Sequence, residues 1–242
     1  MGEEQVVDVL EIRKLAALED RHWWYRERRV LLARELRRLA KAGVRPGCAL
    51  DIGAAGGGNS RVMRAHGWRP LALEYSAEGA SVASDRGLDA VRADARCIPM
   101  RSGSVGLVVA FDILEHIDED HLAAEEMVRV LRPGGTALIA VPCDMRLWSA
   151  HDDAVGHVRR YDRGGILRLA AKAGLVVDSI GSWNVLLRPV AAWRRRSSNG
   201  SDLTDLPAAV NLALTGIIAA ERYLPVSRLP GVSLMVRAHR AA

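Results

Sequence analysis

The sequence predicts an α/β protein built on a doubly wound, mostly parallel sheet of seven strands. Two observations support this fold class. From Cys48 onward, short apolar runs alternate with stretches of helical periodicity, which is typical of repeated strand–helix units. The runs are apolar on both faces rather than alternating, as expected for strands that are covered by helices on both sides.

The elements are expected in the following order. An amphipathic helix over Arg26–Lys41 comes first and stops before Pro46; helical spacing also extends upstream to Asp8, with an interruption at residues 22–25. Strands are expected at Cys48–Gly53, Pro70–Tyr75, Asp89–Ala93, Gly106–Phe111, Thr136–Val141, Leu175–Ile180 and Gly231–His239. Further helices are expected at Asn59–His66, Ala77–Arg86, Glu119–Leu131 and Arg163–Ala173. Residues 1–46 are thus predicted to form an N-terminal helical segment, and residues 47–242 the main domain.

Two segments of the main domain interrupt the regular alternation. Residues 143–163 include a polar loop after the fifth strand, and residues 184–229 form a helical insertion before the last strand. The insertion combines the basic run Arg194–Arg196, a loop at Ser197–Ser201 and two short apolar helices. Three roles are open for it: a cover over a hydrophobic substrate, a homodimer interface, or a contact with a membrane surface or a lipid-linked substrate.

The composition of the 242 residues, 49% hydrophobic and 26% charged, is that of an ordinary soluble protein. The net charge of +5 raises the question of nucleic acid, but the 34 basic residues include only three lysines, a bias typical of a GC-rich genome, so no nucleic-acid partner is expected. The three cysteines form no CxxC pair, which favours a reducing, cytoplasmic location. No secretory signal is expected at the acidic N-terminus, and Pro207–Ala220 is too short and too polar for a transmembrane segment.

The most informative motif is a glycine-rich turn after the first strand. An apolar strand ends in Asp51, and the turn from Gly53 to Gly58 leads into a helix. Glycines let the backbone approach a ligand closely, and the start of the helix favours an anionic group. By itself the pattern also occurs as plain structure, so it needs support from other parts of the chain.

Acidic residues follow the next strands and supply that support. Glu74 ends the second strand, where a carboxylate can accept bonds from both hydroxyls of a ribose. Asp94 follows the third strand, within reach of an exocyclic amine. Phe111 and Asp112 close the fourth strand, and Leu131–Gly135 turns into the fifth.

Taken together, these motifs resemble class I S-adenosylmethionine-dependent methyltransferases of the bacterial small-molecule type, over about Gly47–Pro142. The resemblance implies the Rossmann-like methyltransferase fold, S-adenosyl-L-methionine as cofactor, and methyl transfer to an O, N or C atom of a small molecule. The cofactor-binding residues that it implies are Asp51, Gly53, Ala55, Gly57, Glu74, Tyr75, Asp94, Ala95, Phe111 and Asp112. The chain departs from the family pattern at Ala55, where a second glycine is usual, and at Gly106, where the fourth strand usually begins with Asp.

The polar loop supplies the candidate catalytic and substrate residues. Similar His-Asp and Gly-His-x-Arg-Arg-Tyr segments in bacterial members of the family imply a loop on the substrate side. His151 or His157 is the candidate general base, because histidine titrates near neutral pH. The candidate substrate residues are Trp24, Tyr25, Trp148, Asp152, Arg159, Arg160 and Tyr161.

Each of these roles has a structural alternative. Arg159 and Arg160 could instead pair with Asp152, Asp153 or Asp162 and stiffen the loop. A metal site from His151, Asp152 and His157 is a further alternative, although no metal is expected.

Three other segments have two interpretations each. Residues 22–25 are either a hinge between N-terminal helices or an aromatic lid, with Arg28 or Arg29 reaching a carboxylate. His116 is expected to bond a local backbone group rather than to act in catalysis. Cys143 is expected to be a small apolar residue rather than a nucleophile.

Other functions remain as alternatives to the methyltransferase. An NAD-dependent oxidoreductase would share the strand, the glycine turn and the acid, but the middle glycine next to the pyrophosphate is missing. A nucleic-acid-binding or RNA-modifying protein would use the basic helix Arg26–Lys41 and the run Arg194–Arg196. A scaffold that binds the cofactor without turnover is the third alternative.

Overall fold

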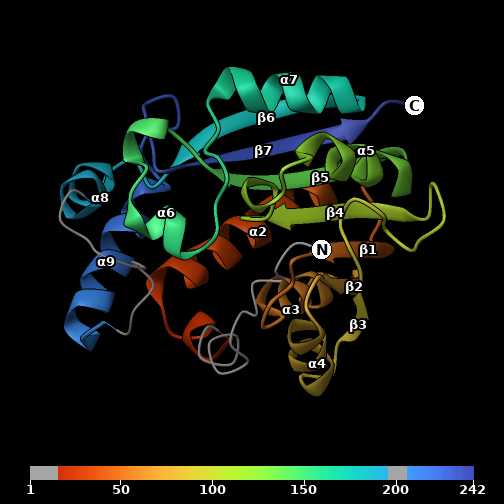
Figure 1. Cartoon of the computed structure of the whole chain (residues 1–242), viewed down its shortest axis with the longest axis horizontal. Coiled ribbons are helices and arrows are strands. Elements are labelled where there is room, and N and C mark those ends of the chain that lie inside the picture. The colour runs from red at the N-terminus through yellow and green to blue at the C-terminus, as the bar shows by residue number, and fades with distance from the viewer. Residues whose placement is uncertain (1–15, 196–205) are drawn as a thin grey trace.

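A computed structural model describes residues 16–195 and 206–242 of the protein (Figure 1). Its centre is a seven-stranded sheet with the order β3-β2-β1-β4-β5-β7-β6. The strands are β1 (Cys48–Ile52), β2 (Arg69–Glu74), β3 (Asp89–Arg92), β4 (Val105–Phe111), β5 (Leu131–Pro142), β6 (Leu175–Trp183) and β7 (Ser233–Arg240). Strands β1 to β5 pair in parallel, and β7 is antiparallel to both β5 and β6. The predicted doubly wound, mostly parallel sheet of seven strands is confirmed.

The strand order indicates where a ligand would bind. The chain runs outward from β1 to β3 and then returns to β4, which pairs with the other side of β1. In such sheets ligands bind at the carboxyl ends of the strands, where the direction of winding changes. We call the ends of β1, β2 and β3 the β1–β3 edge, and the ends of β4 and β5 the β4–β5 edge.

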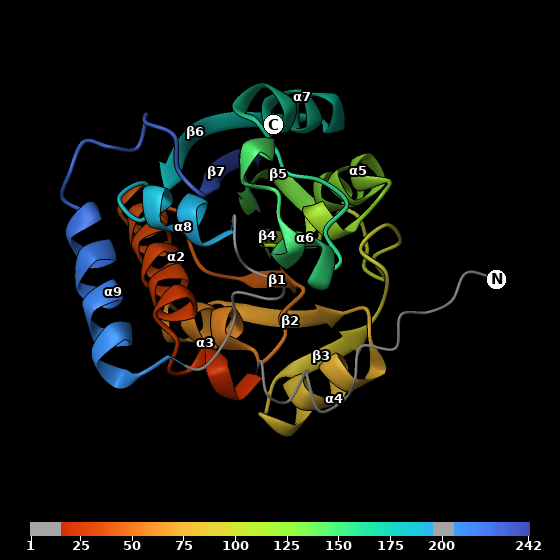
Figure 2. The same cartoon turned by 60° about the vertical axis from the view of Figure 1, so that its left-hand side comes forward.

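Helices cover both faces of the sheet (Figure 2). The α-helices of the described residues are α2 (Trp23–Lys41), α3 (Gly58–Ala65), α4 (Ala77–Asp85), α5 (Asp120–Val130), α6 (Ala150–Ala154), α7 (Arg163–Ala173), α8 (Arg188–Arg195) and α9 (Ala208–Glu221). Helices α2 and α3 pack on one face, where Leu36 and Met63 meet β4 residues such as Val109. Helices α5 and α7 pack on the other, where Met127 and Ile166 join the main core. Alternate residues of each strand therefore enter different cores, which explains why the strands are apolar on both faces.

Several element boundaries differ from the sequence-based prediction; strand β6, for example, ends at Trp183 rather than at Ile180. Helix α2 begins at Trp23, three residues before the predicted start, because the His22 side chain caps it by accepting a bond from the Trp24 N–H (3.3 Å). Strand β5 begins at Leu131 rather than Thr136, and its first residues pair with β4 across a register shift. The prediction treated these residues only as a turn because they contain Pro133 and two glycines.

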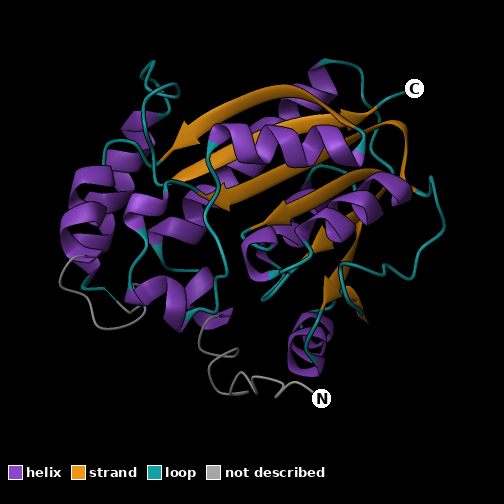
Figure 3. Ribbon diagram, turned by 45° about the horizontal axis from the view of Figure 1, so that its top comes forward, coloured by secondary structure: helices purple, strands orange, loops and turns teal. Residues whose placement is uncertain are grey.

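The insertion before β7 packs along α2 through α9 (Figure 2), and helices gather beyond one end of the sheet (Figure 3). At the start of α2, the Asn211 side chain of α9 accepts a bond from Trp23 N–H (2.9 Å) and donates one to Arg21 O (3.0 Å). The predicted loop at Ser197–Ser201 and the helical spacing at residues 8–14 lie outside the described residues. Within residues 16–195 and 206–242, no helix has the length and apolarity to cross a bilayer.

Candidate functional site

The glycine-rich turn after β1 adopts a backbone that depends on its glycines. Gly53 has a φ of +68°, and a Cβ atom there would lie 1.8 Å from Ile113 Cδ1. Gly57 is also left-handed, at +78°, and caps α3. Ala55, the departure from the family pattern, adopts a φ of +45°, so its methyl group is accommodated in a region that L-residues seldom enter. The turn therefore has the shape that a close backbone approach requires.

Two carboxyl groups flank this turn. Asp51 is fully buried, and its Oδ2 accepts a bond from Ser60 Oγ (2.7 Å), while Oδ1 has no hydrogen-bond partner. Glu74, at the end of β2, accepts a bond from the backbone N–H of Ala55. Burial raises the pKa of both carboxyl groups to about 7. Two desolvated acids, one of them with an unused oxygen, form a group suited to a polar, cationic ligand.

The third predicted acid already has a partner. Asp94 accepts bonds from the Arg96 guanidinium, with contacts of 2.7–3.1 Å, and this ion pair holds the pKa of Asp94 below its usual range. A ligand amine at Asp94 would compete with Arg96. Ala95 is buried, whereas the Tyr75 side chain is 63% exposed beside the β1–β3 edge.

The N-terminal segment closes over the glycine turn, which the sequence did not indicate. Arg86 donates to Gly56 O (2.6 Å) and to Ala16 O (2.9 Å), so it ties α4, the turn and the first described residues together. Glu19 is buried next to Gly56, and burial raises its pKa to about 7. No motif marks Glu19 or Arg86, because each matters only through contacts with distant segments.

The β4–β5 edge is organised around Arg28 of α2. Its guanidinium lies 5.1 Å from the Trp24 ring, 5.6 Å from the Phe111 ring and 4.7 Å from the Trp183 ring. The same group pairs with Asp112, whose φ of +56° turns the chain sharply after β4. Arg28 thus reaches a carboxylate, and the aromatic residues of α2 surround it. His22 caps the start of α2, and Trp24 packs against Trp183 (4.4 Å between ring centroids). The roles of residues 22–25 as a hinge or as a lid stay predictions.

Tyr25 also faces this edge. Burial, together with the nearby Glu19 and Asp112 carboxylates, raises the pKa of its phenol above its usual range. The residue is therefore a neutral hydrogen-bonding group at neutral pH.

The polar loop is held together by Asp152. This fully buried carboxylate accepts two bonds from Arg160 (2.8 and 2.9 Å), one from His157 Nδ1 (2.8 Å) and one from Ser149 N–H (3.0 Å). Although burial opposes it, these partners lower the pKa of Asp152 to about 2. The Arg160–Asp152 pair is one of the structural pairings expected from the sequence. With its oxygens used in this way, Asp152 is not available for the metal site considered with His151 and His157.

The other predicted loop residues lie around this centre. Arg159 pairs with Asp120 (2.8 Å) rather than with an acid of its own loop, and Tyr161 donates to the same carboxylate (2.7 Å). Trp148 donates from Nε1 to Asp153 (3.1 Å). Their roles in substrate binding stay predictions.

His151 and His157, the predicted bases, are brought together, with ring centroids 6.2 Å apart. The Nε2 atom of His157 points at Glu115 Oε1 at 3.8 Å, and its side chain is 9% exposed. His116 bonds the Gly156 carbonyl through Nδ1 (3.3 Å), as expected of a histidine that satisfies a backbone group. A general-base role for either predicted histidine stays a prediction.

Cys143 is unsuited to nucleophilic chemistry. Its thiol is buried, donates to Gly231 O (3.2 Å), and has its pKa raised by burial to about 11. The residue is therefore part of the packing under the loop.

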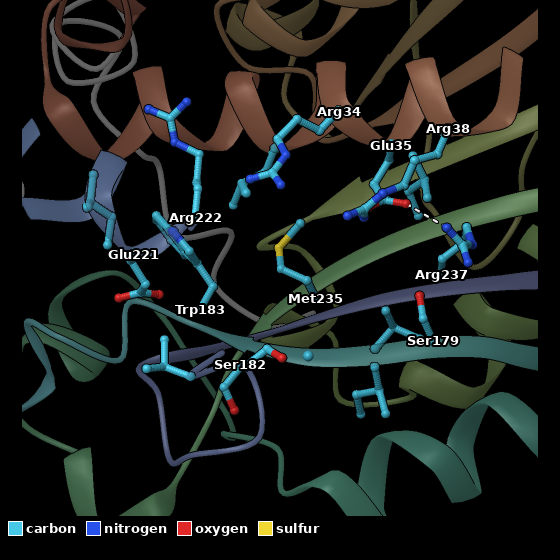
Figure 4. Close-up of a pocket in the computed structure, with 18 of the residues that line it drawn as sticks. Arg34, Glu35, Arg38, Ser179, Ser182, Trp183, Glu221, Arg222, Met235 and Arg237 are labelled. Carbon is cyan, nitrogen blue, oxygen red and sulfur yellow. Dashed lines mark hydrogen bonds and ion pairs between the residues drawn. The ribbon is translucent and has the colours of Figure 1, made fainter. Parts of the chain in front are cut away.

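A cavity of about 340 Å³ opens from the β4–β5 edge along α2 (Figure 4). Phe111 and Trp183 line the end near Arg28, and Met235 of β7 lies between the walls. Six charged residues line it together with these apolar groups: Arg34, Arg38, Arg222, Arg237, Glu35 and Glu221. Nothing in the sequence marked this cavity, because α2, β6, β7 and the segment after α9 come together only in the fold.

Comparison with known proteins agrees with this architecture. A probable S-adenosylmethionine-dependent methyltransferase of Mycolicibacterium smegmatis is 27% identical over 172 residues, which cover 69% of this chain and 64% of that protein. The match thus spans less than two thirds of that relative. Among solved structures, a geranyl diphosphate methyltransferase in complex with S-adenosylmethionine has a TM-score of 0.55 at 19% identity, covering 81% of this chain and 79% of its own. The [4+2]-cyclase SpnF has a TM-score of 0.57 at 16% identity, covering 87% and 81%.

These similarities to solved structures concern the fold alone. SpnF has this fold and is named a cyclase, so the fold does not determine the reaction. The family is given by the sequence pattern of the methyltransferase domain, which matches residues 24–180 and so covers both edges described above. This chain belongs to the methyltransferase domain family.

Proposed function

We propose that this protein is an S-adenosylmethionine-dependent methyltransferase that acts on a small amphipathic molecule with an acidic group. The observation that carries the first half is the arrangement at the β1–β3 edge, where the unpartnered Oδ1 of Asp51 and the carboxyl of Glu74 flank a left-handed turn at Gly53. The methionine end of the cofactor carries an ammonium and a sulfonium, so buried acids with an unused oxygen fit it. We therefore assign Asp51, Gly53 and Glu74 to the binding of the cofactor at the β1–β3 edge.

The chain's own residues would act by binding and orientation. When bound, S-adenosylmethionine supplies a methyl group that is already activated as a sulfonium. Glu74 would accept from the ribose hydroxyls, and Gly53 would admit the ligand close to the backbone. Phe111 and the Arg28–Asp112 pair would fix one wall of the reacting region and exclude water. Alignment of this kind supplies up to about 7–11 kcal/mol of rate enhancement.

The cavity supports the second half of the proposal. About 340 Å³ suits a small molecule, and its Phe111–Trp183 end adjoins the β4–β5 edge where the acceptor atom must lie. Its walls combine apolar side chains with arginines and two glutamates. Arg38 and Arg237 pair with Glu35, and Arg222 pairs with Glu27. A ligand with an apolar body and an acidic group would therefore bind at Arg34. A protein of the same fold is named a geranyl diphosphate methyltransferase, and its acceptor combines these two features.

Two measurements test the proposal. Isothermal titration should give saturable binding of S-adenosylmethionine and no heat with NAD. Cell extracts incubated with the cofactor should then yield an acidic product in which a methyl group has replaced a hydrogen, detected by mass spectrometry. Tight cofactor binding with no product from any extract would favour the scaffold alternative, and binding of NAD instead would favour the oxidoreductase.

The acceptor class is tested in the cavity. Arg34→Gln should raise KM for the acidic acceptor by about tenfold, the effect of one charge-assisted hydrogen bond, with the cofactor Kd unchanged. Arg37→Gln is the matched control, because Arg37 lies on the same helix, is exposed and does not line the cavity. Equal effects of the two substitutions would contradict an acidic group in this cavity.

A further inference from the structure

A group of three potential metal ligands lies directly beyond the β4–β5 edge. Glu115 and His116 belong to the short helix η1 (Leu114–His116) after β4, and His157 follows α6. One ligand atom from each residue lies within 4.8 Å of the others. We propose that Glu115, His116 and His157 bind a divalent transition-metal ion. Its role in catalysis, but not its binding, rests on the function proposed above.

The strongest support is the carboxyl group of Glu115. The residue is fully buried, and neither of its oxygens has a hydrogen-bond partner. An ionised carboxyl group that is buried without a hydrogen-bond partner costs several kcal/mol. A cation next to Glu115 would remove this cost, and His157 Nε2 already lies 3.8 Å from Oε1 on the side where the cation would sit.

The two histidines are oriented as metal ligands usually are. His157 holds Asp152 through Nδ1 (2.8 Å), and His116 holds the Gly156 carbonyl through Nδ1 (3.3 Å). With the proton on Nδ1 in each ring, both Nε2 atoms keep a lone pair for a cation. A carboxylate or carbonyl behind the ring is the common outer support of a metal-bound histidine, and Arg160 in turn fixes Asp152.

The ligand types indicate which cation is preferred. Two imidazoles and one carboxylate suit Zn²⁺, Fe²⁺, Co²⁺ or Mn²⁺, whereas Ca²⁺ and Mg²⁺ prefer oxygen ligands. Metal–ligand bonds of about 2.0–2.2 Å require the three side chains to draw slightly closer on binding. Three protein ligands leave further positions open, and His116 places the cluster at an exposed part of the edge.

The cation would change how the acceptor loses its proton. A hydroxyl that binds an open position becomes more acidic and releases its proton to water. Its oxygen lone pair then forms the O–C bond to the methyl group as the S–C bond breaks. His157 Nε2 cannot hold the cation and accept this proton at once, so His157 would be a metal ligand in place of the general base predicted from the sequence.

Binding of Co²⁺ to the chelator-treated, cofactor-free protein tests the site without any assay of methyl transfer. Calorimetry should give one ion per chain, and the absorption spectrum should show imidazole coordination. We expect Glu115→Gln and His116→Ala each to weaken Co²⁺ binding at least about tenfold, with His121→Ala unchanged. His121 is the matched control, because it is an exposed histidine on the neighbouring helix α5.

The outcomes separate the site from the proposed function. Equal Co²⁺ affinity in wild type, Glu115→Gln and His116→Ala would overturn the metal site, whatever the activity. His116→Ala keeps the test decisive if Glu115→Gln fails to fold, because His116 is exposed and its removal leaves no buried group unpaired. One Co²⁺ bound through these residues supports the site even in a protein that transfers no methyl group.

Discussion

The β1–β3 edge is made by residues close together in the chain, whereas the β4–β5 edge is made by residues far apart in it. Asp51, Gly53, Ala55 and Ser60 lie within ten positions, and Glu74 ends the adjacent strand. Across the β4–β5 edge, Arg28 pairs with Asp112, 84 positions away. One edge is therefore a local motif that the backbone shapes, and the other is assembled by packing. The two edges should respond differently to substitution.

The largest expected effect is on the loop of the β4–β5 edge. Arg160→Leu leaves the buried Asp152 carboxylate without its main partner, which should lower the free energy of unfolding by about 3–5 kcal/mol. Urea denaturation measures this loss. Arg159→Leu, the neighbouring control, breaks a more exposed pair with Asp120 and should cost no more than about 1 kcal/mol.

The same variant tests whether the β1–β3 edge and the β4–β5 edge act independently. The measurement is made at low temperature, at which Arg160→Leu remains folded. The affinity of this variant for S-adenosylmethionine should stay within about threefold of wild type, because sites without shared partners act independently. Loss of cofactor binding in step with acceptor turnover would mean that the edges form a single unit.

This division also explains what could be predicted from the sequence. The strands, the doubly wound fold class and the acids at the strand ends follow from period, turn chemistry and spacing, all of which are local. The place of β7 between β5 and β6 was not predicted. The family resemblance assigned the turn and Glu74 a role in the same way. Arg28 or Arg29 was expected to reach a carboxylate, but the partner Asp112 and the place of Glu19 could not be predicted, because they are set by how α2 and the first described residues pack on the sheet. His157 was singled out as a base, or as a metal ligand with His151 and Asp152, since its spacing does not reveal Glu115 opposite it. The group of Glu115, His116 and His157 depends on how η1 and the loop pack.

The second effect concerns the turn of the β1–β3 edge. Gly53→Ala should weaken cofactor binding by about tenfold or more, because the new methyl group requires both a strained φ and displacement of Ile113. Gly43→Ala is the matched control: its φ is +83°, and nothing lies within 4 Å of the new Cβ. Calorimetry should therefore separate backbone strain, common to both, from the contact unique to Gly53. Similar cofactor affinity in the two variants would argue against a close approach at this turn.

A smaller effect should appear in the pH dependence of cofactor affinity. Burial raises the pKa of Glu74 from 4.5 to about 7 in the cofactor-free protein, so the free fold loses stability from this group as pH rises from about 4.5 to 7. Ribose hydroxyls need the ionised, acceptor-only form, so binding should release a proton and strengthen as pH rises from 6 to 8. The ratio of Kd at pH 6 to Kd at pH 8 should be about tenfold larger in wild type than in Glu74→Gln.

Asp51 provides the internal control for this measurement. Its pKa is also raised to about 7, so Glu74→Gln should retain the part of the pH dependence that belongs to Asp51. A ratio unchanged by Glu74→Gln would show that Glu74 binds no hydroxyl group.

The smallest effect is expected at Tyr75, a predicted cofactor residue whose side chain is largely exposed. Its ring is 63% exposed, so it gains area only when an adenosyl group covers it. Tyr75→Ser should therefore weaken cofactor binding by only a few fold, about 0.5–1.5 kcal/mol, and should leave the unfolding free energy unchanged. An effect on stability instead would place Tyr75 among the packing residues. A loss of affinity as large as that of Gly53→Ala would mean that the β1–β3 edge binds through exposed side chains as much as through its backbone.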